Sequence, residues 1–181
     1  IYYNKLLDFA SSNSIKREVI IRLMTGNEYT DKIVALKYAR QVIGLDKTDN
    51  WLLSKAYIII ARQEFESGNY AKSKSSFKKV TELSFYDEGA EAKYYLAYLT
   101  YLDEDLVLAE QLIFALAVDY NNDHFIAKAF ILLSDIYVAQ DNVFQAKATL
   151  ESIIENHDDE DVINVARKKW ELILERAKEM A

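Results

Sequence analysis

The sequence predicts an all-α protein, a right-handed α-solenoid of antiparallel helical hairpins. Three observations support this fold class. The 181 residues include no proline and only four glycines, a composition that suits long helices and poorly suits sheets with many turns. Helices with apolar residues on nearly every side alternate with helices that are apolar on one side. This alternation recurs along the chain, as internal repeats of a helical array do.

The first segments predict a half-repeat followed by a hairpin. Residues 1–12 contain Tyr2, Leu6, Leu7 and Phe9 but have no upstream helix to pack on. Such a lone helix is typical of the outer helix of a truncated repeat. Residues 14–45 then form a shorter helical pair, with Ala35 and Ala39 in its second helix.

The next hairpin, residues 51–84, shows the alternation most clearly. From Trp51 to Ser67 apolar residues lie on nearly every side, so this inner helix must be covered on more than one flank. A turn follows at Gly68, and residues 71–83 keep few apolar positions, with lysines between them. This pattern predicts a one-sided outer helix.

Two further hairpins, 87–119 and 123–156, repeat the pattern, and a closing helix covers 160–180. Polar breaks separate the helices of each pair, and Asp105 and either Asp141 or Asn142 are predicted to be N-caps. The acids before the last helix are predicted to cap it. Trp170 is predicted to anchor that helix in the core. Together these segments predict a single solenoid over residues 1–181.

Small residues fix the register between repeats. In the outer helices Ser73, Ala109 and Ala146 stand 36 and then 37 residues apart, each four residues before a large apolar residue. In the inner helices a small residue directly follows a large aliphatic one; these small residues are Ala61, Ala97 and Ser134. Helices can approach closely only where side chains are small, so these positions are expected at helix crossings.

This order of small and large residues resembles the tetratricopeptide repeat (TPR), whose pattern is W-x₂-L-G-x₂-Y…A-x₃-F over about 34 residues. The chain departs from the pattern in its longer units, in Glu64 and Thr100 at the usual tyrosine position, and in lacking the closing proline. The longer units and alanine-rich inner helices are similar to bacterial cell-envelope TPR proteins. That resemblance alone implies a periplasmic or envelope location.

Charge and motif content exclude several function classes. Residues 1–90 carry a net charge of +3 and residues 91–181 a net of −10, which disfavours nucleic-acid binding by the second half. The apolar runs are too short for insertion into a membrane. His124 and His157 lack a second histidine at ligand spacing, and no catalytic motif occurs. We therefore expect no metal, no cofactor and no enzymatic activity.

A tyrosine stripe suggests where a partner binds. Tyr94, Tyr98 and Tyr101 share one face of an inner helix, and tyrosine is typical of interface hot spots. Equivalent positions in the flanking inner helices extend the face. The candidate partner-binding residues on this concave face are Lys55, Ile58, Arg62, Phe65, Tyr94, Tyr98, Tyr101, Ile131 and Asp135. Alternatively, the stripe belongs to the core between repeats or packs against the closing helix.

The predicted function is a non-catalytic protein–protein interaction scaffold that docks a peptide or helix of a partner along the concave face. The lysine/asparagine clamp with which some TPR proteins hold a C-terminal carboxylate is absent, because Ile58, Tyr94 and Ile131 occupy its positions. Two alternatives belong to other classes. One is a structural spacer within a longer repeat protein, with possible self-association. The other is a glycan-capturing module that uses the tyrosines.

Overall fold

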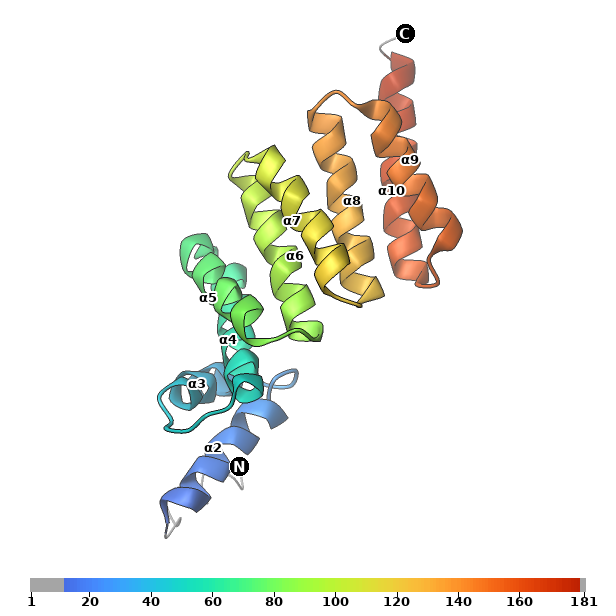
Figure 1. Ribbon diagram of the computed structural model, residues 1–181. Helices are drawn as coiled ribbons and strands as arrows, with labels where there is room; N and C mark the ends of the chain where they lie inside the picture. Colours follow the sequence, from blue (N-terminus) through green and yellow to red (C-terminus); the bar gives the residue numbers. More distant parts are fainter. Residues whose placement is uncertain (1–11, 180–181) are drawn as a thin grey trace. The chain divides into compact units, whose positions relative to one another are not determined.

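A computed structural model describes residues 12–179 (Figure 1), and this part of the chain consists of helices and their connections. The prediction of an all-α helical-repeat fold is confirmed. The half-repeat predicted for residues 1–12 lies outside the described residues except for Ser12. The helices are α2 (Asn13–Gly26), α3 (Lys32–Ile43), α4 (Asn50–Glu66), α5 (Tyr70–Leu83), α6 (Asp87–Leu102), α7 (Leu106–Asp119), α8 (Asp123–Ala139), α9 (Val143–Asn156) and α10 (Glu160–Glu179).

The contacts divide the chain into two compact units, residues 1–92 (unit 1) and residues 93–181 (unit 2), which meet within α6. In unit 1 the consecutive helices α2, α3, α4 and α5 pack each on the next. In unit 2 α8 packs against α7, α9 and α10 (Figure 1). Helices α8 and α10 are successive inner helices, so their contact links one repeat to the next. A single solenoid over the whole chain stays a prediction.

The small residues lie where the sequence places them. Ala61 and Ser73 are fully buried at the crossing of α4 and α5, and the Ser73 hydroxyl donates a 3.0 Å hydrogen bond to the Ala61 carbonyl oxygen. This bond shows that the two backbones approach each other closely at that point. Within unit 2 the remaining members of the set are also buried: Ala97, Ala109, Ser134 and Ala146. The predicted register is confirmed.

The same backbone turn occurs in three successive hairpins. Gly68, Glu104 and Asp141 all adopt left-handed conformations, with φ of 74°, 63° and 58°. In each turn the N–H of the next residue donates to the carbonyl five positions before it, as in Asp105 to Thr100 at 3.2 Å. This arrangement satisfies carbonyl groups at the end of the inner helix. The turns recur at the spacing of the small residues, so the repeat is present in the backbone as well as in the packing.

The turns also decide the N-caps. The Asp105 carboxylate accepts the Leu108 N–H at 3.1 Å, and the Asn142 side chain accepts the Gln145 N–H at 3.3 Å. Both N-caps were predicted. Asp141, the alternative to Asn142, is not a cap, because it occupies the left-handed position that ends α8. A residue in that position belongs to the preceding helix end rather than to the next helix start.

Replacing Glu104 by glycine is expected to stabilise the protein by about 1 kcal/mol, because a side chain with a β-carbon is strained at positive φ. Gly68 already occupies the equivalent position in the preceding turn. Thermal unfolding followed by circular dichroism measures the change. Glu155→Gly, in an exposed position of α9, is the control and should destabilise by about 1 kcal/mol. A lower melting temperature for Glu104→Gly would contradict the argument.

The closing helix begins at a cap and packs through one stripe. The Asp159 carboxylate accepts the N–H groups of Asp161 and Val162 at 2.9 and 3.4 Å, which confirms that this acidic run caps α10. Trp170 packs against a buried cluster of α8, α9 and α10 side chains, and its indole N–H donates to Glu151 at 2.9 Å. Because Trp170 is only partly buried, it lies at the edge of the core rather than inside it.

Candidate functional site

The nine predicted partner-binding residues fall into two groups. Lys55, Ile58, Arg62 and Phe65 lie on α4 in unit 1. Tyr94, Tyr98 and Tyr101 on α6, with Ile131 and Asp135 on α8, lie in unit 2. The two groups differ in their packing and in their charge balance.

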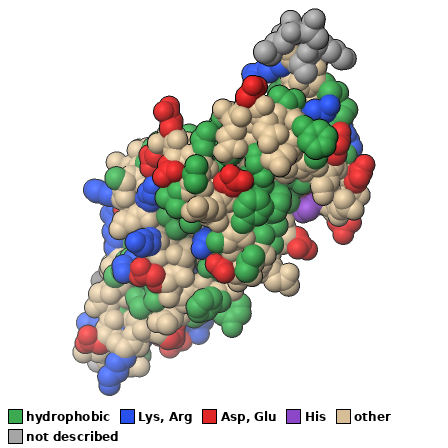
Figure 2. All heavy atoms as spheres, turned by 45° about the horizontal axis from the view of Figure 1, so that its top comes forward, with side chains coloured by type: hydrophobic (Ala, Val, Ile, Leu, Met, Phe, Trp, Pro, Cys, Tyr) green, Lys and Arg blue, Asp and Glu red, His purple; other side chains and the backbone are tan. Residues whose placement is uncertain are grey.

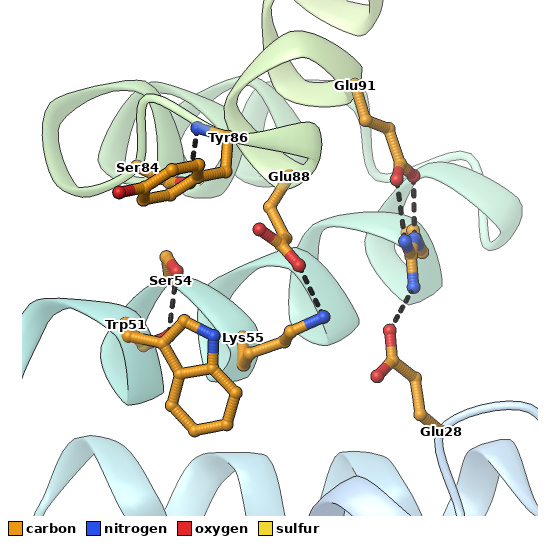
Figure 3. A network of polar contacts seen from close by, with 9 residues as sticks. Glu28, Trp51, Ser54, Lys55, Ser84, Tyr86, Glu88 and Glu91 are labelled. Carbon is orange, nitrogen blue, oxygen red and sulfur yellow. Dashed lines mark hydrogen bonds and ion pairs between the residues drawn. The ribbon is translucent and has the colours of Figure 1, made fainter. Parts of the chain in front are cut away.

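In unit 1 the predicted cations are already neutralised. Arg62 donates to both carboxylate oxygens of Glu91 at 2.6 Å and to Glu28 at 2.7 Å, and Lys55 pairs with Glu88 (Figure 3). Lys55 and Arg62 stand seven residues apart on α4, while Glu88 and Glu91 stand three apart at the start of α6. Both spacings keep the paired residues on one helix face. We call Glu28, Lys55, Arg62, Glu88 and Glu91 the Arg62 network.

The Arg62 network is partly buried, so each of its charged side chains needs an oppositely charged partner. The side chains of Glu28 and Glu91 are 6% and 10% exposed. Burial alone would lower the pKa of Arg62, but the hydrogen bonds and charges of Glu91 and Glu28 raise it well above its usual value. Arg62 is therefore a permanent cation whose contacts hold α4 against α6 and the turn before α3.

The other two unit 1 residues offer little surface. Ile58 is fully buried, so its predicted contact with a partner is at odds with the structure, and we leave it out of the site. Its side chain therefore lies in the packed interior of unit 1 and not at the surface. Phe65 is partly buried and stacks on Tyr70 with ring centroids 5.6 Å apart. A small pocket of about 230 Å³ lies beside Arg62 and is lined by Tyr29, Lys32 and Ile59 among others.

In unit 2 four of the five predicted residues line an open cleft, which we call the tyrosine cleft. Its volume is about 340 Å³, near the lower end of the range for ligand pockets. Residues of α6, α8 and α10 contribute to it, so it lies on the inner helices. The lining residues are Tyr94, Tyr98, His124, Lys128, Ile131, Leu132, Asp135, Asp161, Val162, Val165 and Lys169.

Aromatic stacking orders one wall of the tyrosine cleft. The ring of Tyr94 stacks on Tyr98 at 6.4 Å between centroids and contacts Phe125 of α8 at 6.0 Å. The ammonium group of Lys128 lies 5.0 Å from the Tyr94 ring centroid, within cation–π range. Burial, followed by the neighbouring Tyr95, Tyr98 and Asp135, raises the pKa of Tyr94 to about 12. Its hydroxyl therefore stays protonated at neutral pH.

The charged side of the tyrosine cleft is paired in part. Lys169 of α10 donates to both oxygens of Asp135 at 2.5 and 2.7 Å. Lys128 differs from Lys169. Within residues 12–176 its ammonium group contacts the aromatic rings of Tyr94 and Phe125 and not a carboxylate. Tyr101 is partly exposed and does not line the cleft. Its pKa is raised, first by burial and second by the charge of Asp135.

Sequence reasoning found four lining residues and missed several others. Tyr94, Tyr98, Ile131 and Asp135 were predicted, and the structure brings them together. Lys128, Val165 and Lys169 were missed. A signal for Lys169 exists in the sequence, because it stands 34 residues from its partner Asp135. Arg62 and Glu28 are also 34 residues apart, as are Lys32 and Glu66. Opposite charges 34 residues apart, two to three fewer than the spacing of the small residues, thus mark contacts between neighbouring repeats.

Two kinds of site have no candidate in the described part of the chain. Among those residues no cluster of histidine and acidic side chains could hold a metal ion. Over the same range, none of the helices combines the length and apolar character needed to cross a bilayer.

The comparisons with known proteins support the fold. No protein-family model matches the chain, and no curated protein matches its sequence. The chain is similar to a solved structure described as BtubC (BKLC) from P. vanneervenii, with 19% identity, a TM-score of 0.62 and coverage of 98% of this chain and 85% of that one. A structure described as the P58(IPK) TPR domain is also similar, with 16% identity, a TM-score of 0.48 and coverage of 97% and 50%. Taken with the repeated turns and the buried small residues, the likeness to the BtubC structure shows that the fold is an all-α helical-repeat fold.

Proposed function

We propose that this protein is a non-catalytic scaffold that binds a peptide or helix of a partner protein in the tyrosine cleft of unit 2. TPR-like folds commonly mediate protein interactions. The observation that supports the cleft as the binding site is its composition: stacked, half-buried tyrosines lie beside Val165 of α10, which is 47% exposed. An apolar side chain of the partner would enter the cleft and cover this surface.

The Arg62 network supports a division of roles within the protein. Its cation is held by two carboxylates, so a partner would have to break existing ion pairs to bind there. In the tyrosine cleft, by contrast, a partner can cover aromatic and apolar surface beside the Lys169–Asp135 ion pair without having to break it. Aromatic side chains in such pockets contribute much of the binding free energy of interfaces.

Replacing Tyr98 by alanine is expected to weaken peptide binding by at least about tenfold, the usual effect of truncating a hot-spot residue. A displayed library of random peptides, selected on the wild-type protein, supplies the ligands. Their affinities for wild-type and Tyr98→Ala protein are then compared by fluorescence anisotropy. Tyr86→Ala is the matched control, because Tyr86 is 77% exposed in unit 1 and does not line the tyrosine cleft.

The experiment separates the proposed site from other surfaces. Circular dichroism must show that Tyr98→Ala retains its helical content. Selected peptides that bind wild-type and Tyr98→Ala protein equally would place the binding surface elsewhere and contradict the proposal. A library that yields no binding peptide would contradict it as well.

A further inference from the structure

The outer helices differ sharply in what they present to solvent. In the register set by the buried residues Ser73, Ala109 and Ala146, two outward positions can be compared across α5, α7 and α9. At the first position α5 has Lys78 and α9 has Glu151. At the second position α5 has Glu82 and α9 has Glu155. In α7 the same two positions are Phe114 and Val118. All six residues are exposed.

These α7 residues belong to a continuous uncharged stripe. Val107, Gln111, Phe114 and Val118 follow the spacing of one helix face, and we call them the α7 stripe. Val107 is 64% exposed, Phe114 44% and Val118 84%. The stripe is about 16 Å long at the rise of an α-helix. At the Phe114 and Val118 positions the flanking outer helices carry charges, whereas at the Val107 position α5 has Ala71 and α9 has the exposed Phe144. The apolar residues at the C-terminal half of α7 therefore indicate a surface that a partner covers.

A groove adjoins the stripe. The ring of Phe114 packs edge-on against Phe130 of α8, with centroids 6.2 Å apart. Phe130 in turn lines a groove of about 740 Å³ between α8 and α9, together with Ile126 and Ala148. Phe114 therefore connects the stripe to an open groove on α8 and α9.

Acidic residues at both ends of this surface indicate what covers it. Glu104 and Asp105 precede α7, Asp119, which pairs with Lys93 at 3.3 Å, ends it, and Asp123 and Asp158 line the groove. On the face seen in Figure 2, apolar side chains also lie beside acidic ones. A second copy of the chain that met this surface with its own α7 stripe would bring acids against acids, which costs free energy. A helix with an apolar face and basic residues at its ends complements the stripe in both respects.

We propose that the α7 stripe and the adjoining groove form a second docking surface, on the outer helices of unit 2, for a basic amphipathic helix of a partner protein. The apolar face of that helix covers Val107, Phe114 and Val118. Its lysines or arginines pair with the flanking acids. This surface is separate from the tyrosine cleft, since no residue lines both.

The test uses a synthetic leucine–lysine peptide of about 18 residues, roughly 27 Å long as a helix, with leucines on one face. Binding to the full chain is measured by fluorescence anisotropy. The double variant Phe114→Lys with Val118→Glu introduces the residues that α5 carries at these positions and leaves the net charge unchanged. We expect binding at least about tenfold weaker than for wild type.

The matched control is Phe85→Lys with Tyr86→Glu, a charge-neutral change at two unit 1 residues that are 76% and 77% exposed. It should bind the peptide as wild type does, and a leucine–glutamate peptide should not bind. Equal binding by the α7 double variant, or no binding by wild type, would overturn the proposal. Concentration-dependent dimerisation that the double variant abolishes would assign the stripe to a second copy instead. Loss of binding in Tyr98→Ala alone would assign the peptide to the tyrosine cleft.

Discussion

Replacing Arg62 by alanine is expected to destabilise unit 1 by about 3 kcal/mol, near the lower end of the cost of removing one partner from a buried ion pair. The variant leaves the carboxylates of Glu28 and Glu91 close together, buried and without a cation. The lower end applies because the Arg62 side chain is 27% exposed, so water offsets part of the loss. Urea unfolding measures the change in free energy.

The two tryptophans allow the units to be followed separately. Trp51 lies in unit 1 and Trp170 in unit 2, so a Trp170→Phe background leaves Trp51 to report unit 1. Arg62→Ala should lower the urea midpoint of the Trp51 signal. A triple variant, Glu28→Gln, Arg62→Met and Glu91→Gln, should recover most of the loss, because it removes the charges together. An unchanged midpoint for Arg62→Ala would show that the carboxylates are hydrated and that the network contributes little.

The fold could be predicted because its determinants are local or periodic. Ser73, Ala109 and Ala146 recur at spacings of 36 and 37 residues, and all three are fully buried. The N-cap Asp105 follows from residue type and position alone. Asp141 was the ambiguous case, since aspartate is favoured both at N-caps and in left-handed turns. Only the backbone shows which of the two it adopts.

The candidate site could be predicted in part, because its residues depend on contacts between repeats. Tyr94 and Tyr98 are found from their spacing on one helix. The neutralisation of Arg62 is not, since Glu28 comes from a turn and Glu91 from the start of another helix. The burial of Ile58 was likewise missed: helical spacing gives the face of a residue but not what packs on that face. The exposed α7 stripe becomes visible once the register allows the outer helices to be compared.

Phe77 provides the largest expected effect on stability. It is the aromatic residue of the Ser73-x₃-Phe77 pattern in α5 and is fully buried. Truncation to alanine removes a whole ring from a packed interior, and the neighbouring helices can collapse into the cavity only partly. We expect Phe77→Ala to destabilise unit 1 by about 3–5 kcal/mol, the usual cost of such a truncation.

The control for Phe77→Ala is Phe85→Ala, the same substitution at a residue that is 76% exposed in the same unit. Its effect should stay within about 0.5 kcal/mol, as for surface substitutions in general. Both variants are compared by urea unfolding with Trp51 as the reporter, in the Trp170→Phe background. If the two phenylalanines contributed equally, Phe77 would not be packed between α4 and α5. The repeat register that places Ser73 against Ala61 would then be wrong, and the comparison of outward positions on α5, α7 and α9 would fail with it.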